Sequence, residues 1–391
     1  MYMREKVNTQ ILDNAKDRFF HCRASRKLTS ALFWLHYFMF LISMLVFCTL
    51  NVRGIWVPRW SIDDYSNIIA TLDGRFNHVF LQVYALDEAY YPSRIVPTRR
   101  PDDTWLKNFL KDARRKNIKV SAWVNVFYSW GFAPKTNNRR HPVNFHPNWY
   151  VHDKSGRSIL GLDIEELRRR GIEGYYLAPS NEQVRDRVLS LIDEVLDQYD
   201  FDGIHLDYCR YPAPGFIYDV AARSKFMRAY CADPVGLSLP GSEKRFGTWG
   251  NGDLEQRWHE FVRDDLTSFI QEVNRRIKLR KPSTELSVAV KADYQAASRD
   301  FFQDWPTWVN ASLVDFVCLM AYQNNIEAVL AKTLKVIDDP SRVAVGLGIY
   351  RLSADRIKKQ VSQVAALPFS GVVFFSYEEL KKNEAFRYLL D

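Results

Sequence analysis

The sequence predicts an α/β fold, a (β/α)8 TIM barrel preceded by an N-terminal transmembrane helix or signal segment. Eight short apolar runs alternate with helix-like stretches from residue 53 onward. Strands that alternate with helices pair in parallel, and eight such units make a TIM barrel. A doubly wound open sheet is the alternative, but no Gly-x-Gly-x-x-Gly turn follows the first apolar run, which disfavours it.

The expected strands are short runs rich in Val, Ile and aromatic residues, bounded by turn residues. They comprise residues 54–58, 78–84, 118–126, 202–207, 285–292, 314–321, 342–348 and 370–376. Helices are expected at residues 63–72, 103–116, 182–198, 254–280, 327–337 and 354–365.

Two connections, 127–181 and 208–253, are much longer than the others. Long ordered connections are uncommon unless they are functional, and both leave the C-terminal ends of their strands. We therefore expect them to wall one cleft with aromatic and histidine side chains. These are Trp130, His141, His146, Trp149, Tyr150, Tyr211, Phe216 and Trp249.

The chain divides into three segments on its charge pattern. Residues 1–27 hold seven Lys/Arg against three acidic residues, half of the formal net charge of +8, and are expected to be a basic cytoplasmic leader. Residues 28–50 contain no charged residue and are long enough to span a bilayer, as a signal anchor or a signal sequence. Residues 53–391 are expected to form the barrel.

The basic leader predicts that the N-terminus stays in the cytoplasm and the barrel is translocated. The barrel would then be membrane-anchored in the periplasm or outside the cell, or secreted if the segment is cleaved. Beyond residue 27 no long basic run appears, so nucleic acid is not an expected partner. The five cysteines have no C-x-x-C or Cys/His spacing, and we expect neither a metal site nor a cofactor.

The run from Tyr199 to Pro212 contains the strongest catalytic candidate. His205 and Asp207 stand two positions apart in one apolar strand, so both point to the same face. Asp207 ends the strand, and carboxylates at strand ends under long loops are where α/β barrels keep their chemistry. His205 either tunes Asp207 by hydrogen bonding or is a core histidine with its own partners.

The same rule places other polar residues at the expected mouth of the barrel. The expected substrate-binding residues are Trp56, Gln82, Tyr84, Trp123, Asn125, His205, Arg210, Lys291 and Tyr322. Hydrolysis of a glycosidic bond normally needs two carboxyl groups. Asp293, at the end of the fifth strand, is the expected partner of Asp207. The alternatives on loops or the rim are Asp163, Glu165, Glu166 and Glu378.

Several segments resemble the glycosyl hydrolase-like 10 family in their order along the chain. They are Arg53–Val57, Phe80–Tyr84, Ala122–Asn125, His146–Trp149, Leu177–Arg185 and Asp202–Tyr208 with Tyr211-Pro212. The resemblance covers about residues 53–391 and implies a bacterial glycosidase-type TIM barrel, often exported or membrane-attached, with Asp207 at the family's acidic position. This chain has Tyr208 where the family commonly has a second Asp, and Val83 where it has an Arg.

Two functions from different classes follow. The first is a glycoside hydrolase that cleaves O-glycosyl bonds of an extracellular or cell-envelope polysaccharide by carboxylate acid/base chemistry. The second is a non-catalytic carbohydrate-binding barrel. The aromatic content of 14% suits either one, because sugar rings stack their C–H faces on aromatic rings.

Overall fold

The computed structural model describes residues 50–390 apart from 238–240, 384 and 387–388. Eight parallel strands form one sheet that closes because β1 pairs with both β2 and β11. The strands, in order around the barrel, are β1 (Val52–Val57), β2 (His78–Ala85), β4 (Lys119–Asn125), β7 (Gly203–Asp207), β8 (Glu285–Lys291), β9 (Phe316–Met320), β10 (Val343–Gly348) and β11 (Gly371–Phe375). The predicted barrel is confirmed.

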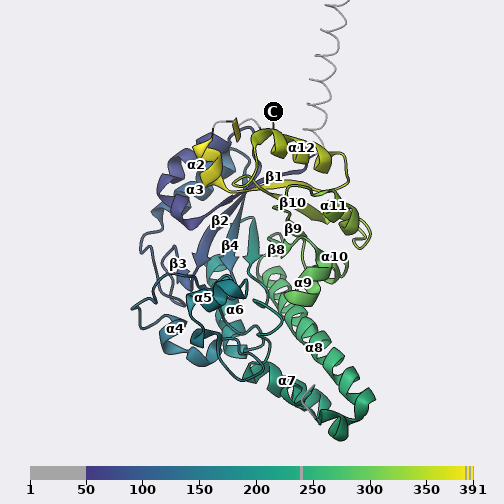
Figure 1. Ribbon diagram of the computed structural model, residues 1–391. Coiled ribbons are helices and arrows are strands. Elements are labelled where there is room, and N and C mark those ends of the chain that lie inside the picture. The colour runs from purple at the N-terminus through teal and green to yellow at the C-terminus, as the bar shows by residue number, and fades with distance from the viewer. Residues whose placement is uncertain (1–49, 238–240, 384, 387–388, 391) are drawn as a thin grey trace, which may run out of the picture. The chain divides into compact units, whose positions relative to one another are not determined.

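Helices cover the outside of the barrel (Figure 1). They are α2 (Tyr65–Leu72), α3 (Thr104–Arg115), α6 (Glu182–Gln198), α8 (Ser242–Arg280), α9 (Tyr294–Asp300), α10 (Trp305–Asn310), α11 (Glu327–Thr333), α12 (Ala354–Ala365) and α13 (Tyr377–Lys382). Side chains fix several starts: Asn181 accepts hydrogen bonds from the first turn of α6, and Ser353 does the same for α12. Such caps satisfy backbone N–H groups that have no partner within the helix.

The connection after β4 contains short elements rather than a featureless loop. They are β5 (Tyr128–Trp130), α4 (Pro142–Phe145), α5 (Ile164–Arg169) and β6 (Tyr175–Tyr176). β5 and β6 pair into a separate two-stranded sheet. A two-residue strand, β3 (Glu88–Ala89), pairs antiparallel with the C-terminal end of β2.

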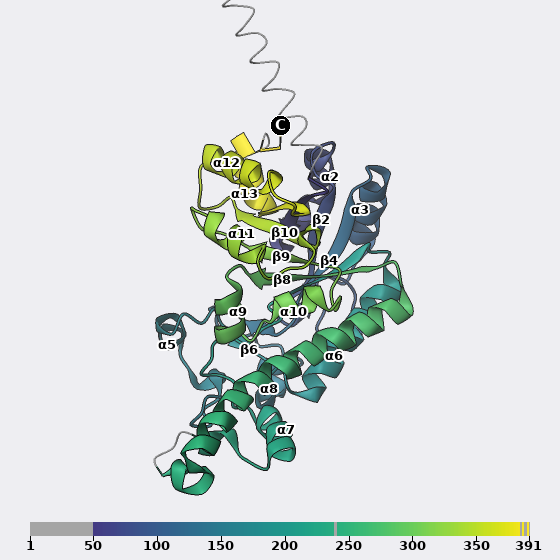
Figure 2. The same cartoon turned by 90° about the vertical axis from the view of Figure 1, so that its right-hand side faces the viewer.

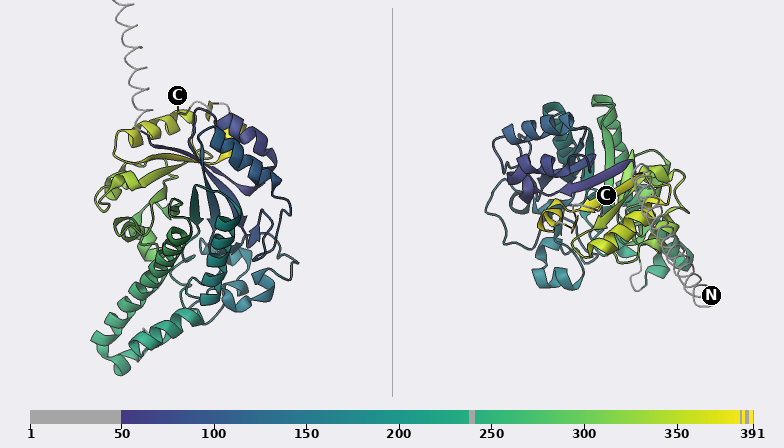
Figure 3. Two further views of the ribbon diagram at one scale, coloured as in Figure 1. Left: turned by 180° about the vertical axis from the view of Figure 1, so that it is seen from behind. Right: turned by 90° about the horizontal axis from the view of Figure 1, so that it is seen from above.

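The connection after β7, residues 208–253, was expected to help wall the cleft, but most of it projects away from the barrel. It forms α7 (Val220–Tyr230) and the first part of α8, and the two helices project from the barrel as a pair (Figures 1 and 3). The remainder of α8 returns along α6 on the outside of the barrel (Figure 2). Apolar side chains such as Phe226 and Trp258 pack between α7 and α8, which explains why this segment folds on itself.

The interior of the barrel is filled by large side chains from neighbouring strands. Trp56, Phe80, Trp123 and Phe316 form one buried cluster there with smaller residues. A packed interior of this kind is typical of TIM barrels and leaves the C-terminal ends of the strands as the place for a site.

The expected leader at residues 1–27 and, apart from Leu50, the expected signal anchor or signal sequence at residues 28–50 lie outside the described residues. Among the helices from residue 50 onward that the structure describes, none combines the length and the apolar character needed to span a bilayer.

Candidate active site

A cavity of about 660 Å³ opens at the C-terminal ends of the barrel strands. Seven of the predicted substrate-binding residues line it together with Asp207. They are Trp56, Gln82, Trp123, Asn125, Arg210, Lys291 and Tyr322. These residues lie at or just beyond the C-terminal ends of six different strands, and the barrel brings them together around one cavity.

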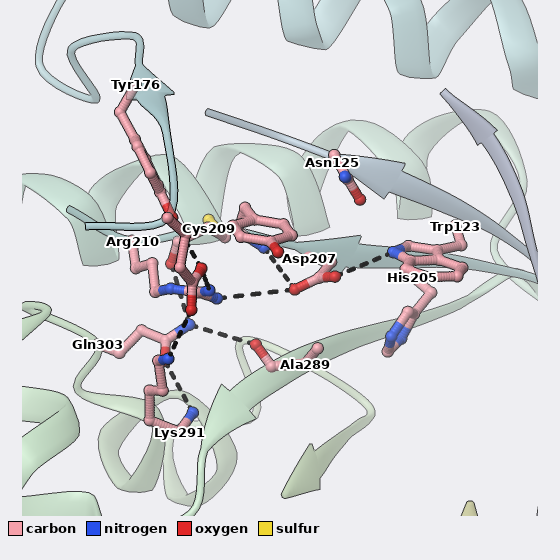
Figure 4. A network of polar contacts seen from close by, with 12 residues as sticks. Trp123, Asn125, Tyr176, His205, Asp207, Cys209, Arg210, Ala289, Lys291 and Gln303 are labelled. Atoms are coloured by element: carbon pink, nitrogen blue, oxygen red, sulfur yellow. Dashed lines mark hydrogen bonds and ion pairs between the residues drawn. The ribbon is translucent and has the colours of Figure 1, made fainter. Parts of the chain in front are cut away.

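Asp207 lies at the base of this cavity and is 7% exposed. Its Oδ1 accepts a hydrogen bond from the Tyr208 backbone N–H at 2.7 Å, and its Oδ2 accepts one from Trp123 Nε1 at 3.2 Å (Figure 4). Burial raises the pKa of the carboxyl above its usual value of 3.8, although Arg210 and the Tyr208 N–H favour the charged form. Asp207 is therefore a carboxyl group whose surroundings favour retention of a proton.

Glu173 is the second carboxylate in the lining of the cavity. Its Oε2 accepts a hydrogen bond from Arg210 Nη2 at 3.0 Å, and Oε1 accepts one from Lys291 Nζ at 3.3 Å. The Glu173 side chain is 43% exposed, so it is only partly removed from water, and the two cations lower its pKa to about 2. The surroundings thus favour the ionised form of Glu173 and the protonated form of Asp207.

Arg210 connects the two carboxylates. Its Nη1 lies 3.7 Å from Asp207 Oδ1 (Figure 4). Its Nη2 contacts Glu173 Oε2 at 3.0 Å. Because the guanidinium holds its terminal nitrogens in a fixed planar fork, the two contacted carboxylate oxygens lie within about 9 Å of each other. This upper limit is compatible with the carboxyl separations of both retaining and inverting glycosidases.

Tyr208 and Tyr128 form a stack beside this pair. The Tyr208 ring packs on Tyr128 with 4.5 Å between centroids, and the Arg210 guanidinium covers Tyr208 at 4.3 Å. Tyr208 adopts a left-handed backbone conformation, with φ 53°, which turns the chain sharply after β7. The position that carries a second Asp in the resembled family thus supplies a packing surface for Arg210 instead.

The local fold around Gly174 presents Glu173 to the cavity. A Cβ at Gly174 would lie 2.3 Å from the Trp130 carbonyl oxygen and 2.7 Å from the Tyr128 ring. Only glycine lets β6 approach β5 this closely. Sequence reasoning missed Glu173 because it lies in a loop where strand periodicity has no meaning. Its signal is the acidic residue between two small or apolar neighbours in Gly171-Ile172-Glu173-Gly174.

Asp293, the expected partner of Asp207, has a different environment. Its Oδ1 accepts hydrogen bonds from the backbone N–H groups of Gln295 and Ala296 at the start of α9, and its Oδ2 pairs with Lys332 at 2.9 Å. It is absent from the cavity lining. The residue follows the end of β8, and α9 begins there at once, so the carboxylate caps the helix.

The other acidic alternatives also have local partners. Asp163 accepts a hydrogen bond from the Glu166 backbone N–H at the start of α5. Glu165 pairs with Arg168, and Glu166 pairs with Arg157 and Arg170. Glu378 accepts a hydrogen bond from Ser61.

His205 and Tyr84 are the two expected substrate-binding residues that the structure places below the cavity lining. His205 is fully buried: its Nε2 accepts from Trp56 Nε1 at 3.0 Å, and its Nδ1 lies 2.9 Å from Ser287 Oγ. These contacts match the interpretation of His205 as a core histidine with its own partners, rather than one that tunes Asp207 by hydrogen bonding. Tyr84 donates its hydroxyl hydrogen to Asp87 in another buried contact.

Gln82 and Asn125 form a polar wall between neighbouring strands. Gln82 Nε2 donates to Asn125 Oδ1 at 3.3 Å, and Gln82 Oε1 accepts from the Arg59 backbone N–H at 3.1 Å. Arg59 was not predicted as a site residue. It comes directly after β1 and Pro58, at the first residue of a 3-10 turn.

Five of the aromatic residues expected to wall the cleft pack within the connections instead, and the side chain of Trp249 lies outside the described part of the chain. Trp130, Trp149, Tyr150, Tyr211 and Phe216 are all at most 9% exposed. The exposed aromatic residues in the lining are Trp60, Phe132 and Tyr350. In the part of the chain that the structure describes, no group of three His, Cys, Asp or Glu side chains could hold a metal ion.

Two carboxyl groups in the C-terminal cavity of a TIM barrel are an arrangement that glycoside hydrolases use. The comparison with protein families agrees: residues 49–360 match the glycosyl hydrolase-like 10 family. The chain belongs to this family.

The chain is also similar to curated proteins at low identity. It is 24% identical to an S-layer-related protein of Niallia circulans and covers 19% of it, and 21% identical to the glycosyl hydrolase YngK of Bacillus subtilis, of which it covers 61%. The matches take in 72% and 78% of this chain. It is 23% identical to the glycosyl hydrolase DigH of Escherichia coli K12, over 79% of this chain and 73% of that one.

Solved structures show the same fold. The glycoside hydrolase domain of PgaB (BpsB) from Bordetella bronchiseptica superposes with a TM-score of 0.64 at 15% identity, covering 87% of this chain and 99% of that one. The α-L-fucosidase isoenzyme 2 of Paenibacillus thiaminolyticus superposes with a TM-score of 0.56 at 13% identity, over 87% of this chain and 48% of that one. At these identities the likeness establishes the barrel and leaves the substrate open.

Proposed function

We propose that this protein hydrolyses glycosidic bonds of a polysaccharide with Asp207 and Glu173 as its two catalytic carboxyl groups. The observation that carries the proposal is the placement of two carboxyl groups in one cavity, joined by Arg210, in surroundings that shift their pKa values in opposite directions. Pairs of acidic groups whose surroundings push their pKa values apart supply the acid and the base of such reactions.

In this scheme Asp207 is the general acid. Burial raises its pKa, so it carries a proton to a higher pH than an exposed aspartate does. It transfers that proton to the glycosidic oxygen as the bond to the anomeric carbon breaks. The leaving sugar then departs as a neutral alcohol, which avoids an alkoxide.

Glu173 is the second carboxylate. It is ionised above a pH of about 2 because Arg210 and Lys291 stabilise its charge. It either attacks the anomeric carbon to form a glycosyl ester, or takes a proton from a water that attacks that carbon. In the first course a water, deprotonated by Asp207, then displaces Glu173 and releases the sugar. The first course retains the anomeric configuration and the second inverts it, and the limit of about 9 Å on the carboxyl separation accommodates both.

Turnover of a glycan library by the wild type, Asp207→Asn and Glu173→Gln tests the proposal. Loss of a positioned acid or base lowers the rate by about 10²–10⁴-fold, so we expect each variant to lose turnover while it still binds the glycan. Asp293→Asn is the matched control, and we expect it to keep wild-type turnover. Binding by all four proteins with no turnover by the wild type would instead identify a non-catalytic carbohydrate-binding barrel.

We further propose that the barrel works outside the cytoplasm, on an extracellular or cell-envelope polysaccharide. The uncharged segment 28–50 after a basic leader supports this location. Protease treatment of intact cells tests it. Degradation of the barrel without lysis is the expected result, and protection until lysis would contradict it.

A further inference from the structure

Cationic side chains outnumber acidic ones in the cavity. Arg59, Arg210, Lys291 and Arg351 line it, against only Glu173 and Asp207. The lining therefore carries two positive charges in excess even when both carboxyl groups are ionised. A water-filled cleft with charges of one sign concentrates ligands of the opposite sign.

The excess is located on Arg59 and Arg351. Among the residues that the structure describes, neither arginine forms an ion pair with a carboxylate. The Arg59 guanidinium lies 4.9 Å from the Trp60 ring centroid, and the Arg351 guanidinium lies 5.1 Å from the Tyr350 ring centroid.

Both aromatic rings are open to solvent. Trp60 is 56% exposed and Tyr350 is 42% exposed, and both belong to the cavity lining. An exposed ring can stack on the apolar face of a sugar. A guanidinium beside it is placed to bind a charged substituent of the same or the next sugar, because its fork matches an oxyanion.

Arg210 offers a further donor inside the cavity. The Arg210 side chain is 3% exposed, and its Nη1 is a buried nitrogen with no hydrogen-bond acceptor. It lies 3.7 Å from Asp207 Oδ1, longer than a hydrogen bond. A buried guanidinium nitrogen without a partner is costly, and a ligand oxygen would satisfy it.

We propose that the substrate is an anionic polysaccharide, whose carboxylate or sulfate groups are bound by Arg59 and Arg351 at the mouth of the cavity, with Arg210 Nη1 as a donor within. This proposal rests on the proposed function and adds the chemical class of the substrate. Either kind of oxyanion fits a guanidinium fork, and the test separates the two.

Binding to matched polysaccharides tests the proposal. Polygalacturonate, alginate and hyaluronan are each compared with their neutral carboxyl-reduced forms, and dextran sulfate is compared with dextran. The full-length Asp207→Asn protein is used so that bound chains are not cleaved. We expect the anionic member of a bound pair to bind at least about 10-fold more tightly at low salt, and less so as salt screens the charges.

Two double variants separate the cavity from the general positive charge of the protein. In the Asp207→Asn background, Arg59→Gln/Arg351→Gln removes the two cations that have no carboxylate partner; Arg59 Nη1 donates instead to Gln82 Oε1 at 3.3 Å. We expect the preference for the anionic polysaccharide to fall at least about 5-fold. Arg115→Gln/Arg275→Gln removes the same charge from exposed surface pairs. We expect this variant to keep its preference for the anionic polysaccharide within about 2-fold of that of the Asp207→Asn protein. If the first double variant loses its anionic preference only for the carboxylated polysaccharides, the ligand is of the uronate type. If it loses the preference only for dextran sulfate, the ligand is a sulfate ester.

The following outcomes would overturn the proposal. Equal binding of anionic and neutral members would do so, and so would an equal loss in the two double variants. Cleavage of neutral glycans by the wild type together with equal binding would leave the proposed hydrolase intact and reject only its anionic substrate. Absence of binding and of cleavage for every glycan would reject both.

Discussion

Arg210 is the residue on which the properties of the candidate pair depend. It lowers the pKa of Glu173 through a direct contact and opposes the rise in the pKa of Asp207. Its own position depends on Tyr208, whose ring it covers. Asp207 could be predicted from the sequence because strand periodicity marks it. The role of Arg210 could not, because it depends on how two loops fold against each other.

Arg210→Met should move the acidic limb of the pH–activity profile to higher pH. The variant leaves Glu173 with Lys291 as its one direct cationic partner, so the pKa of Glu173 rises from about 2 toward its ordinary value. Because Glu173 must be ionised to act, activity should begin at a higher pH. The measurement is the pH dependence of kcat/KM on a substrate found in the library.

Arg210→Lys is the matched control, because it keeps the charge but loses the fork. We expect a smaller shift of the acidic limb from it than from the Met variant. Near-ultraviolet circular dichroism checks that both variants keep native packing. An acidic limb that stays in place in a folded Met variant would show that Arg210 does not set the protonation of Glu173.

At the level of single elements, β10 determines the position of Trp56 in the cavity. Gly346 lies where the ring of Trp56 crosses the barrel, and a Cβ there would be 2.8 Å from that ring and 2.7 Å from the Leu319 carbonyl oxygen. Trp56 in turn donates to His205. A glycine in a strand is often a sign of such a close approach.

Gly346→Ala should destabilise the protein by about 1–3 kcal/mol, the usual cost of an additional group in a packed interior. Urea unfolding measures the change. Gly252→Ala is the control: this residue lies in α8, and a Cβ there would contact nothing within 4 Å. Since alanine favours the helix over glycine by about 1 kcal/mol, the control should gain stability. If Gly346→Ala leaves the free energy of unfolding unchanged, the Trp56 ring can move aside and Gly346 does not fix its position.

The eight barrel strands could be predicted from the sequence to within two residues at each end because each is an apolar run bounded by turn residues. The short strands β3, β5 and β6 were not predicted, because two or three residues show no periodicity. Helix α8 was expected at 254–280 and extends over Ser242–Arg280. Its first part lacks an apolar pattern and contains Gly247, which has a non-helical φ of 68°. The pairing of α7 with α8 could not be predicted, because it depends on contacts between two helices and hydrophobic periodicity describes only one helix at a time.

Across the whole molecule, the barrel core contains histidines that must stay neutral. His78 is 3% exposed, stacks on Phe80 with 4.4 Å between centroids, and contacts Ser121 Oγ at 2.8 Å. Burial lowers the pKa of His78 to about 3, and it lowers the pKa of His205 well below its usual value. Both groups tie the stability of the barrel to pH.

The protein should lose stability as the pH falls from about 6.5 toward 5. In this range the unfolded chain takes up a proton at His78 and the folded protein does not, so protonation favours the unfolded state. The contribution of His78 is present in full above the unfolded pKa and decreases below it, by about 2 kcal/mol at pH 5. Denaturant unfolding measured at several pH values follows this change.

His78→Asn should lower the stability at pH 7.5 and reduce its dependence on pH between 6.5 and 5. Some dependence should persist because His205 remains. An unchanged slope in the variant would show that His78 does not titrate on unfolding.

The proposed chemistry depends most directly on Asp207 keeping a proton at a pH where Glu173 has lost its own. Carbon-13 NMR titration of the side-chain carboxyl groups measures this, with Asp207→Asn and Glu173→Gln to assign the two signals. We predict that Glu173 titrates near pH 2 and Asp207 above 3.8. Titration of Asp207 at or below the pH at which Glu173 titrates would contradict the assignment of acid and base.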